Sequence, residues 1–197
     1  MNAGRWIGAL AMATVLSGCA GGIIPETPPD TYGLSAAPQV AGKGARNRQI
    51  LISDPSALKA LDSEKIVIRP TPSAIEYLAD SQWSDRLPNM VQDKLVQAFE
   101  NSGRVGGVGR PGDGLAIDYK IITGIRAFEI KADRGEQAIV ELSVKILNDR
   151  NGVVVATQVF RASAPVSGSG NAAYVQSLDR AFEIVVQDLV SWTLSRI

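Results

Sequence analysis

The 197-residue sequence contains no histidine and a single cysteine, Cys19. Ser/His/Asp triads, Cys/His dyads and zinc sites with several histidine or cysteine ligands are therefore excluded. An intramolecular disulfide is excluded as well, so the hydrophobic core has to supply the stability of the folded part. We accordingly expect no catalytic residue, no cofactor-binding residue and no metal ligand, and we predict that the protein is not an enzyme.

Blocks of like charge are also missing. Twenty basic and twenty acidic residues give a formal net charge of zero, and the two signs are interspersed along the chain. Binding to nucleic acid depends on concentrated Lys and Arg side chains that neutralise phosphates. We therefore expect no nucleic-acid partner, and any attachment to a membrane has to come from a lipid.

A hydrophobic run long enough to span a membrane is absent at the N-terminus. The apolar segment there covers only residues 6–16 and follows Arg5, whereas a transmembrane helix needs roughly 17–25 residues. A short basic region followed by a short apolar segment is typical of an export signal. We predict that residues 1–18 are a signal peptide.

The tetrapeptide at residues 16–19 reads Leu-Ser-Gly-Cys and resembles the lipobox of bacterial lipoproteins at all four positions. The resemblance implies cleavage between Gly18 and Cys19 and acylation of Cys19 with diacylglyceryl and palmitate chains. Two or more such chains hold a protein on a bilayer, at about 0.8 kcal/mol per buried CH₂. By similarity to enterobacterial sorting, Ala20 favours the outer membrane, facing the periplasm, over the inner membrane.

The remaining chain divides into a tether and one domain. Residues 19–29 comprise the lipidated cysteine and a stretch rich in Gly, Pro and Thr, which indicates a flexible tether. Residues 30–197 are long enough to form a single domain with a sizeable core. Short apolar segments between turn residues predict strands. The first strands are expected at 31–34, 49–52 and 65–69, with a weaker candidate at 74–78.

Two amphipathic helices are predicted. The first has Ser84 or Asp85 as its N-cap and ends at Gly103. Its polar face, which water or a weakly bound partner would contact, carries Gln92, Asp93, Lys94, Gln97 and Glu100. The second begins near Ser169 or Asn171 and repeats apolar residues at three- and four-residue steps as far as Trp192. Its polar face has few cations, so packing on a sheet is favoured over a membrane surface.

The segment 103–114 contains six glycines and predicts a flexible surface loop. Its Gly107-x-Gly109-x-x-Gly112 spacing fits the dinucleotide fingerprint. That fingerprint requires a strand before it and a helix after it, whereas here a helix precedes and a strand follows. We therefore do not predict a nucleotide site.

Three long strands follow the glycine-rich segment. They are expected at 115–130, with a bulge near Gly124, at 138–146 and at 153–164, with a hairpin turn at 149–152. The strands should form an antiparallel meander. The fold class is therefore α+β, with an antiparallel or mixed sheet packed by two main helices in a single domain. Unpaired sheet edges leave a homo-oligomer open.

Two groups of side chains merit a functional test. A carboxylate hydrolase needs paired acids about 5–10 Å apart, and the candidate acids are Asp113, Asp118, Glu129 and Glu141. Turns and wet strand faces carry these acids, which favours a solvating role. Tyr77 and Trp83 offer a contact patch beside the first helix, although aromatics at such a place more often belong to the core.

The order of these elements resembles the auxiliary lipoproteins of ABC-type lipid transport systems, which accompany mammalian-cell-entry domain transporters. The likeness extends over nearly the whole chain after the tether. It rests on residues 30–34 (DTYGL), 83–88 (WSDRLP) with 99–103 (FENSG), 118–120 (DYK) and 125–129 (IRAFE).

The resemblance implies work beside an ABC permease, its ATPase and a mammalian-cell-entry domain protein. In such a system the chain would be an accessory or docking subunit that helps to move lipids or other hydrophobic molecules across the envelope. The alternative is an outer-membrane assembly or structural lipoprotein without a transport role.

Overall fold

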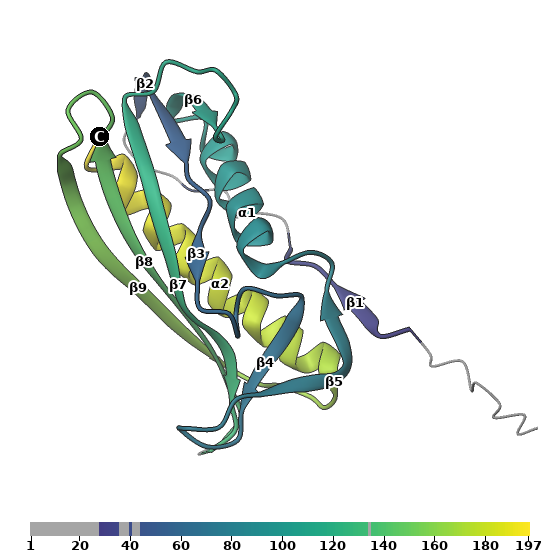
Figure 1. The fold of residues 1–197 in the computed structure, drawn as a ribbon. Helices are drawn as coiled ribbons and strands as arrows, with labels where there is room; N and C mark the ends of the chain where they lie inside the picture. The colour runs from purple at the N-terminus through teal and green to yellow at the C-terminus, as the bar shows by residue number, and fades with distance from the viewer. Residues whose placement is uncertain (1–27, 36–39, 41–43, 134) are drawn as a thin grey trace, which may run out of the picture.

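The computed structural model describes residues 28–35, 40, 44–133 and 135–197 (Figure 1). The predicted signal peptide, Cys19 and most of the predicted tether lie outside the described residues. The described chain forms one α+β domain, as the sequence predicts. Its elements are β1 (Asp30–Tyr32), β2 (Ala45–Ile52), β3 (Ser56–Ala57), β4 (Lys65–Arg69), β5 (Glu76–Trp83), α1 (Leu87–Ser102), β6 (Val105–Gly109), β7 (Tyr119–Lys131), β8 (Gln137–Asn148), β9 (Val154–Pro165) and α2 (Asn171–Leu194).

Strand β7 organises the sheet. Along one edge it pairs antiparallel with β8 over its whole length, from Tyr119 opposite Asn148 to Lys131 opposite Gln137. Strand β9 then continues the sheet antiparallel to β8, after a tight turn at residues 149–152 in which Gly152 has φ of 71°. The predicted antiparallel meander and its hairpin turn are confirmed.

Three separate strands share the other edge of β7. Strands β2, β3 and β4 run parallel to it, opposite the start, the middle and the end of β7 respectively. Strand β6 extends the sheet beyond β2, and β5 with β1 extend it beyond β4. The result is one nine-stranded mixed sheet whose two flanks differ in construction.

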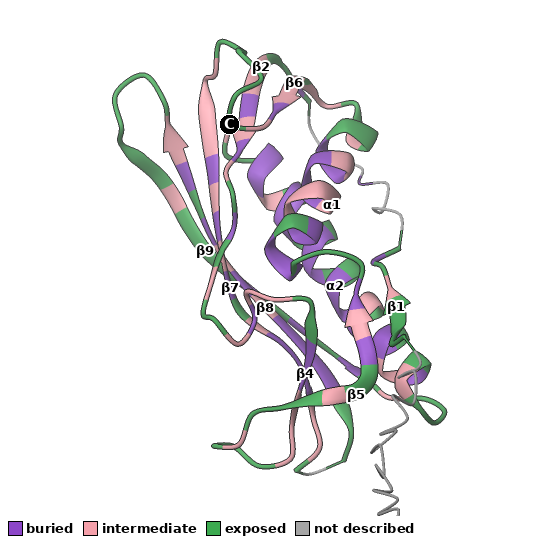
Figure 2. Ribbon diagram, turned by 45° about the vertical axis from the view of Figure 1, so that its right-hand side comes forward, coloured by how far each residue is buried: buried purple, intermediate pink, exposed green. Residues whose placement is uncertain are grey.

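Both helices cover the same face of this sheet (Figures 1 and 2). Helix α2 packs on β8 and β9, and α1 packs at the end formed by β2 and β6. In β8 the residues at every second position from Ala138 to Ile146 are buried beneath α2. Phe128 joins the flanks, because its ring lies 5.8 Å from Trp83 in β5 and 5.6 Å from Phe182 in α2. The opposite face of the sheet carries neither helix.

The prediction of a flexible loop at 103–114 is wrong for residues 105–109, which form β6 parallel to β2. A Cβ atom at Gly106 would lie 2.5 Å from the carbonyl oxygen of Arg46. Glycine is therefore required by the close approach of two backbones rather than by flexibility. Gly107 and Gly109 lie in this strand and no helix follows them, which is incompatible with a dinucleotide fingerprint.

The predicted N-cap of the first helix, Ser84 or Asp85, is wrong, because the N-cap residue is Arg86. The second helix begins at Asn171, as predicted, with Gly170 as its N-cap, and neither N-cap residue makes a side-chain capping hydrogen bond. The Asp85 carboxylate instead accepts hydrogen bonds from the backbone N–H of Arg86 and the side chain of Asn89. Asn171 is the first residue of α2 and donates to the carbonyl oxygen of Ala79. Asp85 thus bonds within its own turn and Asn171 bonds to a distant strand, and neither caps a helix. The predicted end of α1 at Gly103 is confirmed by its left-handed φ of 58°.

Several strand bounds differ from the predicted ones. Strand β2 begins earlier, at Ala45, and β5 continues to Trp83 because β1 and β4 pair with it on either side. Strand β7 begins at Tyr119 rather than at 115. Its bulge lies at Arg126, between the paired residues Ile125 and Ala127, two residues beyond the predicted position.

Candidate functional site

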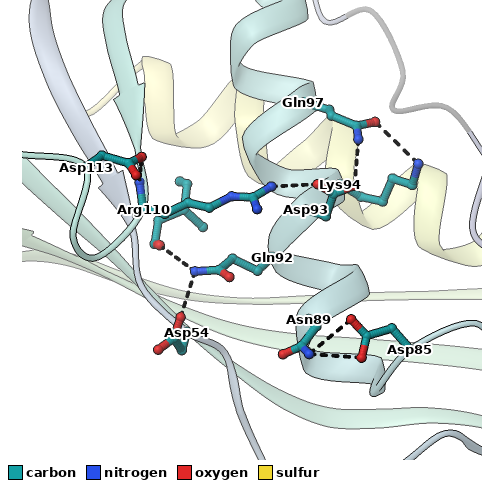
Figure 3. Close-up of polar contacts among 10 residues, drawn as sticks. Asp54, Asp85, Asn89, Gln92, Asp93, Lys94, Gln97, Arg110 and Asp113 are labelled. Atoms are coloured by element: carbon teal, nitrogen blue, oxygen red, sulfur yellow. Dashed lines mark hydrogen bonds and ion pairs between the residues drawn. The ribbon is translucent and has the colours of Figure 1, made fainter.

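A polar groove of about 430 Å³ runs along the solvent side of α1 (Figure 3). The residues directly after β1, the turn before α1, the first two turns of α1 and the segment after β6 form its walls. Leu34 and Met90 are buried beneath it. The lining residues are Gly33, Leu34, Ser84, Asp85, Asn89, Met90, Gln92, Asp93, Lys94 and Arg110.

Gln92 fixes one wall of the groove to the sheet. Its side-chain nitrogen donates to the carbonyl oxygen of Ile52 at 3.0 Å and to the carboxylate of Asp54 at 2.9 Å. Ile52 is the last residue of β2, and Asp54 follows two residues later. The contact therefore places the polar face of α1 beside the carboxyl end of a parallel strand.

Arg110 holds the other wall. Its guanidinium contacts the Asp93 carboxylate at 2.6 Å, and its backbone N–H donates to Asp113 at 2.7 Å. The second oxygen of Asp93 accepts from Gln97 at 2.6 Å, and Lys94 donates to the Gln97 oxygen at 3.3 Å. Such exposed ion pairs contribute roughly 0–1 kcal/mol each, so the network positions side chains more than it stabilises the fold.

The groove therefore presents amides, carboxylates and cations that neighbouring groups already orient. Orienting them in advance lowers the entropy cost of binding a partner that hydrogen-bonds to them. The polar face of α1 predicted from sequence is the source of this surface. The contribution of Arg110 to the lining and the support that Asp54 gives to Gln92 were missed, because both residues follow strands, β6 and β2, that pair only in the folded chain.

Two of the four candidate acids lie at opposite ends of β7. Asp118 precedes Tyr119 and Glu129 stands near the end, which separates them by roughly 36 Å at the rise of an extended strand. The Asp118 carboxylate accepts the backbone N–H of Gln49 at 3.0 Å and contacts Arg150 at 2.8 Å and Arg48 at 3.8 Å. The Gln49 hydrogen bond and then the two arginines lower the pKa of Asp118.

The other acids are also held by basic or backbone groups. Glu129 is nearly buried and accepts a 2.6 Å hydrogen bond from Arg69. The carboxylate of Glu141 lies between two arginines on the helix-free face, 3.8 Å from Arg126 and 3.0 Å from Arg161. Asp113 accepts the backbone N–H of Arg110, as described above.

The two aromatic residues singled out by sequence have different environments. Trp83 is buried in the core, as favoured from sequence. Tyr77 is exposed, and the ammonium of Lys65 lies 4.9 Å from the centre of its ring. Tyr77 lines a second pocket, of about 650 Å³, whose walls include Pro29 and Arg86.

Two properties bear on membranes and metals. Within the described residues, neither helix combines the length and hydropathy that crossing a bilayer demands. The same part of the chain holds no cluster of three acidic, cysteine or histidine side chains arranged to bind a metal ion.

These features define an α+β domain with a mixed sheet, two helices on one face of it and a polar groove along the first helix. The model of the ABC-type transport auxiliary lipoprotein component family matches residues 32–190. The chain belongs to this family, which associates it with the cell envelope and with an ABC transport system.

Three proteins illustrate what this chain is similar to in sequence or in fold. The crystal structure of protein XCC0632 from Xanthomonas campestris is 30% identical with a TM-score of 0.78, covering 84% of this chain and 95% of that one. Protein bll6063 of Bradyrhizobium diazoefficiens is 31% identical over 83% of this chain. The matched region covers only 44% of the length of that protein. The structure of CT253 from Chlamydia trachomatis is 8% identical with a TM-score of 0.53, and the match covers 76% of this chain and 97% of that chain. At this identity the likeness shows the fold alone.

Proposed function

We propose that the chain is the docking subunit of a mammalian-cell-entry type ABC transporter that moves lipids or other hydrophobic molecules across the envelope. Acyl chains on Cys19 would hold it at the outer membrane, facing the periplasm. Its partners would be the mammalian-cell-entry domain protein and, through it, the permease and ATPase. Transport would draw its energy from the ATPase, and this subunit would catalyse no reaction.

The groove along α1 carries the docking part of the proposal. Its pre-oriented amides and carboxylates favour a partner that offers hydrogen-bonding groups, such as a protein surface, over an apolar cargo molecule. A polar contact of this kind is also suited to reversible association, because little apolar surface is left exposed when the partner leaves.

Docking can be tested by removing two groove side chains, with Gln92→Ala combined with Arg110→Ala. Co-purification of the transporter proteins in mild detergent should fall by about tenfold or more, as expected for the loss of two oriented polar contacts at roughly 1 kcal/mol each. Glu100→Ala, on the same helix and outside the groove lining, is the matched control and should retain the partners. Equal recovery with both variants would contradict docking through α1.

The anchor has an independent test. Cys19→Ala should move the protein out of the membrane fraction, because the hydrocarbon attached to the thiol is lost. Mass spectrometry of the wild-type protein should find acyl chains on that residue. An unmodified thiol in the processed protein would overturn the anchoring part of the proposal while leaving the groove test intact.

A further inference from the structure

Strand β5 bulges away from β4 in the middle of their pairing. On β4, the paired residues Lys65 and Val67 are two positions apart. Their partners on β5, Gln82 and Tyr77, are five positions apart. Residues 78–81 of β5 therefore stand opposite a single residue of β4. Bulges of this kind are common beside functional sites, because they redirect side chains away from the regular pleat.

The bulge is held in an uncommon conformation. Asp80 has φ of 52°, a value that residues other than glycine adopt infrequently. The side chain of Asn171, the first residue of α2, donates to the carbonyl oxygen of Ala79 at 2.9 Å. The helix thus fixes the bulge from outside the strand. Strained positions that the surrounding structure enforces in this way are frequent where ligands bind.

The bulge forms one wall of the 650 Å³ pocket described above, to which it contributes Leu78, Asp80 and Ser81. Ser81 is only 7% exposed, and its hydroxyl has no hydrogen-bond partner within the described part of the chain. A buried hydroxyl without a partner is unfavourable and rare in folded proteins. The unpaired hydroxyl therefore indicates a ligand that supplies the missing hydrogen bond.

Two carboxylates of the pocket are available to a cation. Glu64, directly before β4, and Asp80, in the bulge, both line the pocket. Neither side chain forms an ion pair or a hydrogen bond with any residue that the structure describes. Ionised carboxylates only accept hydrogen bonds, and they do so most strongly from charged N–H donors. The two acids therefore favour a ligand with an ammonium group.

Two cations line the same pocket. The Lys65 ammonium lies 4.9 Å from the centre of the Tyr77 ring, and the Arg86 guanidinium contacts Asp62. A guanidinium has five N–H donors and an ammonium has three, so these contacts leave donors for an anion. Arg and Lys are the residues that most often bind phosphate. Free carboxylates together with spare cationic donors favour a zwitterion that carries both an ammonium and a phosphate.

The position of the pocket indicates the source of such a ligand. Pro29 lines the pocket and is the last residue of the predicted tether. It follows Cys19 by ten positions, which is roughly 30 Å of extended chain. A lipid anchor at that cysteine would therefore keep the pocket near the bilayer surface. Ile75 and Tyr77, which are 43% and 41% exposed, are suited to contact the boundary between headgroups and acyl chains.

We propose that this pocket binds the phosphoethanolamine headgroup of a phospholipid in the anchoring bilayer. The ammonium group would donate to Glu64 and Asp80. The phosphate would accept hydrogen bonds from Lys65, Arg86 and the hydroxyl of Ser81. The choice of a zwitterion rests on the pocket alone, whereas the choice of a membrane lipid rests on the proposed lipid anchor. The pocket shares no lining residue with the groove proposed for docking.

Lipid selectivity tests the proposal by native mass spectrometry of the full-length protein in mild detergent. Phosphatidylethanolamine should bind about tenfold more tightly than phosphatidylcholine, whose trimethylammonium has no N–H group to donate. It should exceed phosphatidylglycerol, which has no cation, by a similar factor. Equal binding of the three lipids to the wild-type protein would overturn the proposal.

Removing the free carboxylates should abolish this preference. The variant is Glu64→Gln combined with Asp80→Asn, because asparagine tolerates the left-handed backbone at that position. Glu76→Gln, on β5 and outside the pocket lining, is the matched control and should retain the preference. If the double variant kept its lipid selectivity but lost a co-purifying transporter protein, the pocket would bind a basic protein segment and the proposal would be wrong.

Ser81→Ala separates binding from folding. Since the hydroxyl has no partner in the described chain, its removal should not lower the unfolding temperature, whereas the affinity for phosphatidylethanolamine should fall by about threefold or more. Wild-type affinity in this variant would contradict the proposal.

Soluble O-phosphoethanolamine identifies the source of the bound group and separates the pocket from the anchor. It should displace the lipid from the wild-type protein, and it should bind equally well to Cys19→Ala, because the pocket does not include the anchor. Failure of the anchor would thus leave this result unchanged. Binding of the soluble compound without any binding of the phospholipid would overturn the assignment to a membrane lipid.

Discussion

The two edges of β7 are built in opposite ways. Along one edge, β8 follows it continuously in a hairpin that is close in sequence. Along the other edge, three short strands from a segment more than sixty residues earlier pair with the start, the middle and the end of β7. The first edge needs only local alternation and a turn, whereas the second needs contacts that form after long loops close.

The comparison also bears on function. The locally built edge supports α2, which packs on β8 and β9. The edge built from distant segments positions α1, and with it the groove proposed for docking. The part of the molecule that depends on long-range pairing is thus the part assigned to partner recognition.

Phe128→Ala tests whether the two flanks unfold together. The ring contacts Trp83 from one flank and Phe182 from the other, so its removal should lower the free energy of unfolding by about 3–5 kcal/mol. Urea denaturation followed by tryptophan fluorescence and by circular dichroism measures the change. Val159→Ala, on the helix-free face, should change it by less than about 0.5 kcal/mol. Separate transitions for the two probes in wild type would show that the flanks are independent units.

Gly106→Ala tests only the edge of β7 that is built from distant segments. The added methyl group would meet the Arg46 carbonyl at 2.5 Å, so β6 must separate from β2 at a cost of about 1–3 kcal/mol. Hydrogen exchange should then accelerate in β2 and β6 but not in β8 and β9. Gly107→Ala is the matched control, because its new methyl group meets only the Gln49 side chain at 3.6 Å. Uniform acceleration over the whole sheet would contradict a local effect.

Gly124→Ala tests the locally built edge with a smaller clash. Its methyl group would lie 2.8 Å from Oγ of Ser143, a single atom that can rotate away. We expect a loss of about 1 kcal/mol or less, measured by thermal unfolding. Combining it with Ser143→Ala should recover most of the lost stability. A double variant that is no more stable than Gly124→Ala would show that the strain lies elsewhere.

Asp118→Asn should produce the smallest effect. The pKa of Asp118 is lowered in the folded state. The charged carboxylate therefore stabilises the fold at pH values above the ordinary carboxyl pKa of about 4. This stabilisation is lost as the pH falls through the lowered pKa of the folded state. The free energy of unfolding of wild type should thus exceed that of the variant at pH 7, and the difference should shrink in acid. We expect a difference below about 1 kcal/mol, because both arginines are partly exposed. A difference that grows in acid would contradict the assignment.

Sequence patterns predicted one flank better than the other for a physical reason. The alternation from Ala138 to Ile146 and the Asp-Arg-Asn-Gly turn are complete within about thirty residues, so β8, its turn and β9 were predicted nearly as observed. Strand β6 was mistaken for a loop, because its glycines signal flexibility unless the backbone of β2 is known to approach them. The N-cap of α1 was misplaced for a different reason, since the Asp85 carboxylate bonds to Arg86 and Asn89 in its own turn instead of capping the helix.

The polar face of α1 was recognised from its residues, but the groove was not, because its other walls, at Gly33, Leu34 and Arg110, belong to segments that sequence spacing does not connect.

By itself the sequence determined the α+β class, the two helices, the antiparallel meander and the residue types available for chemistry, because periodicity and composition act over short stretches of chain. It also carried the motif from which anchoring at Cys19 is predicted. Only the tertiary structure decided which distant strands pair with β7 and where α1 opens its groove. Those features depend on which backbones approach one another after the chain has collapsed, and no local pattern encodes that choice.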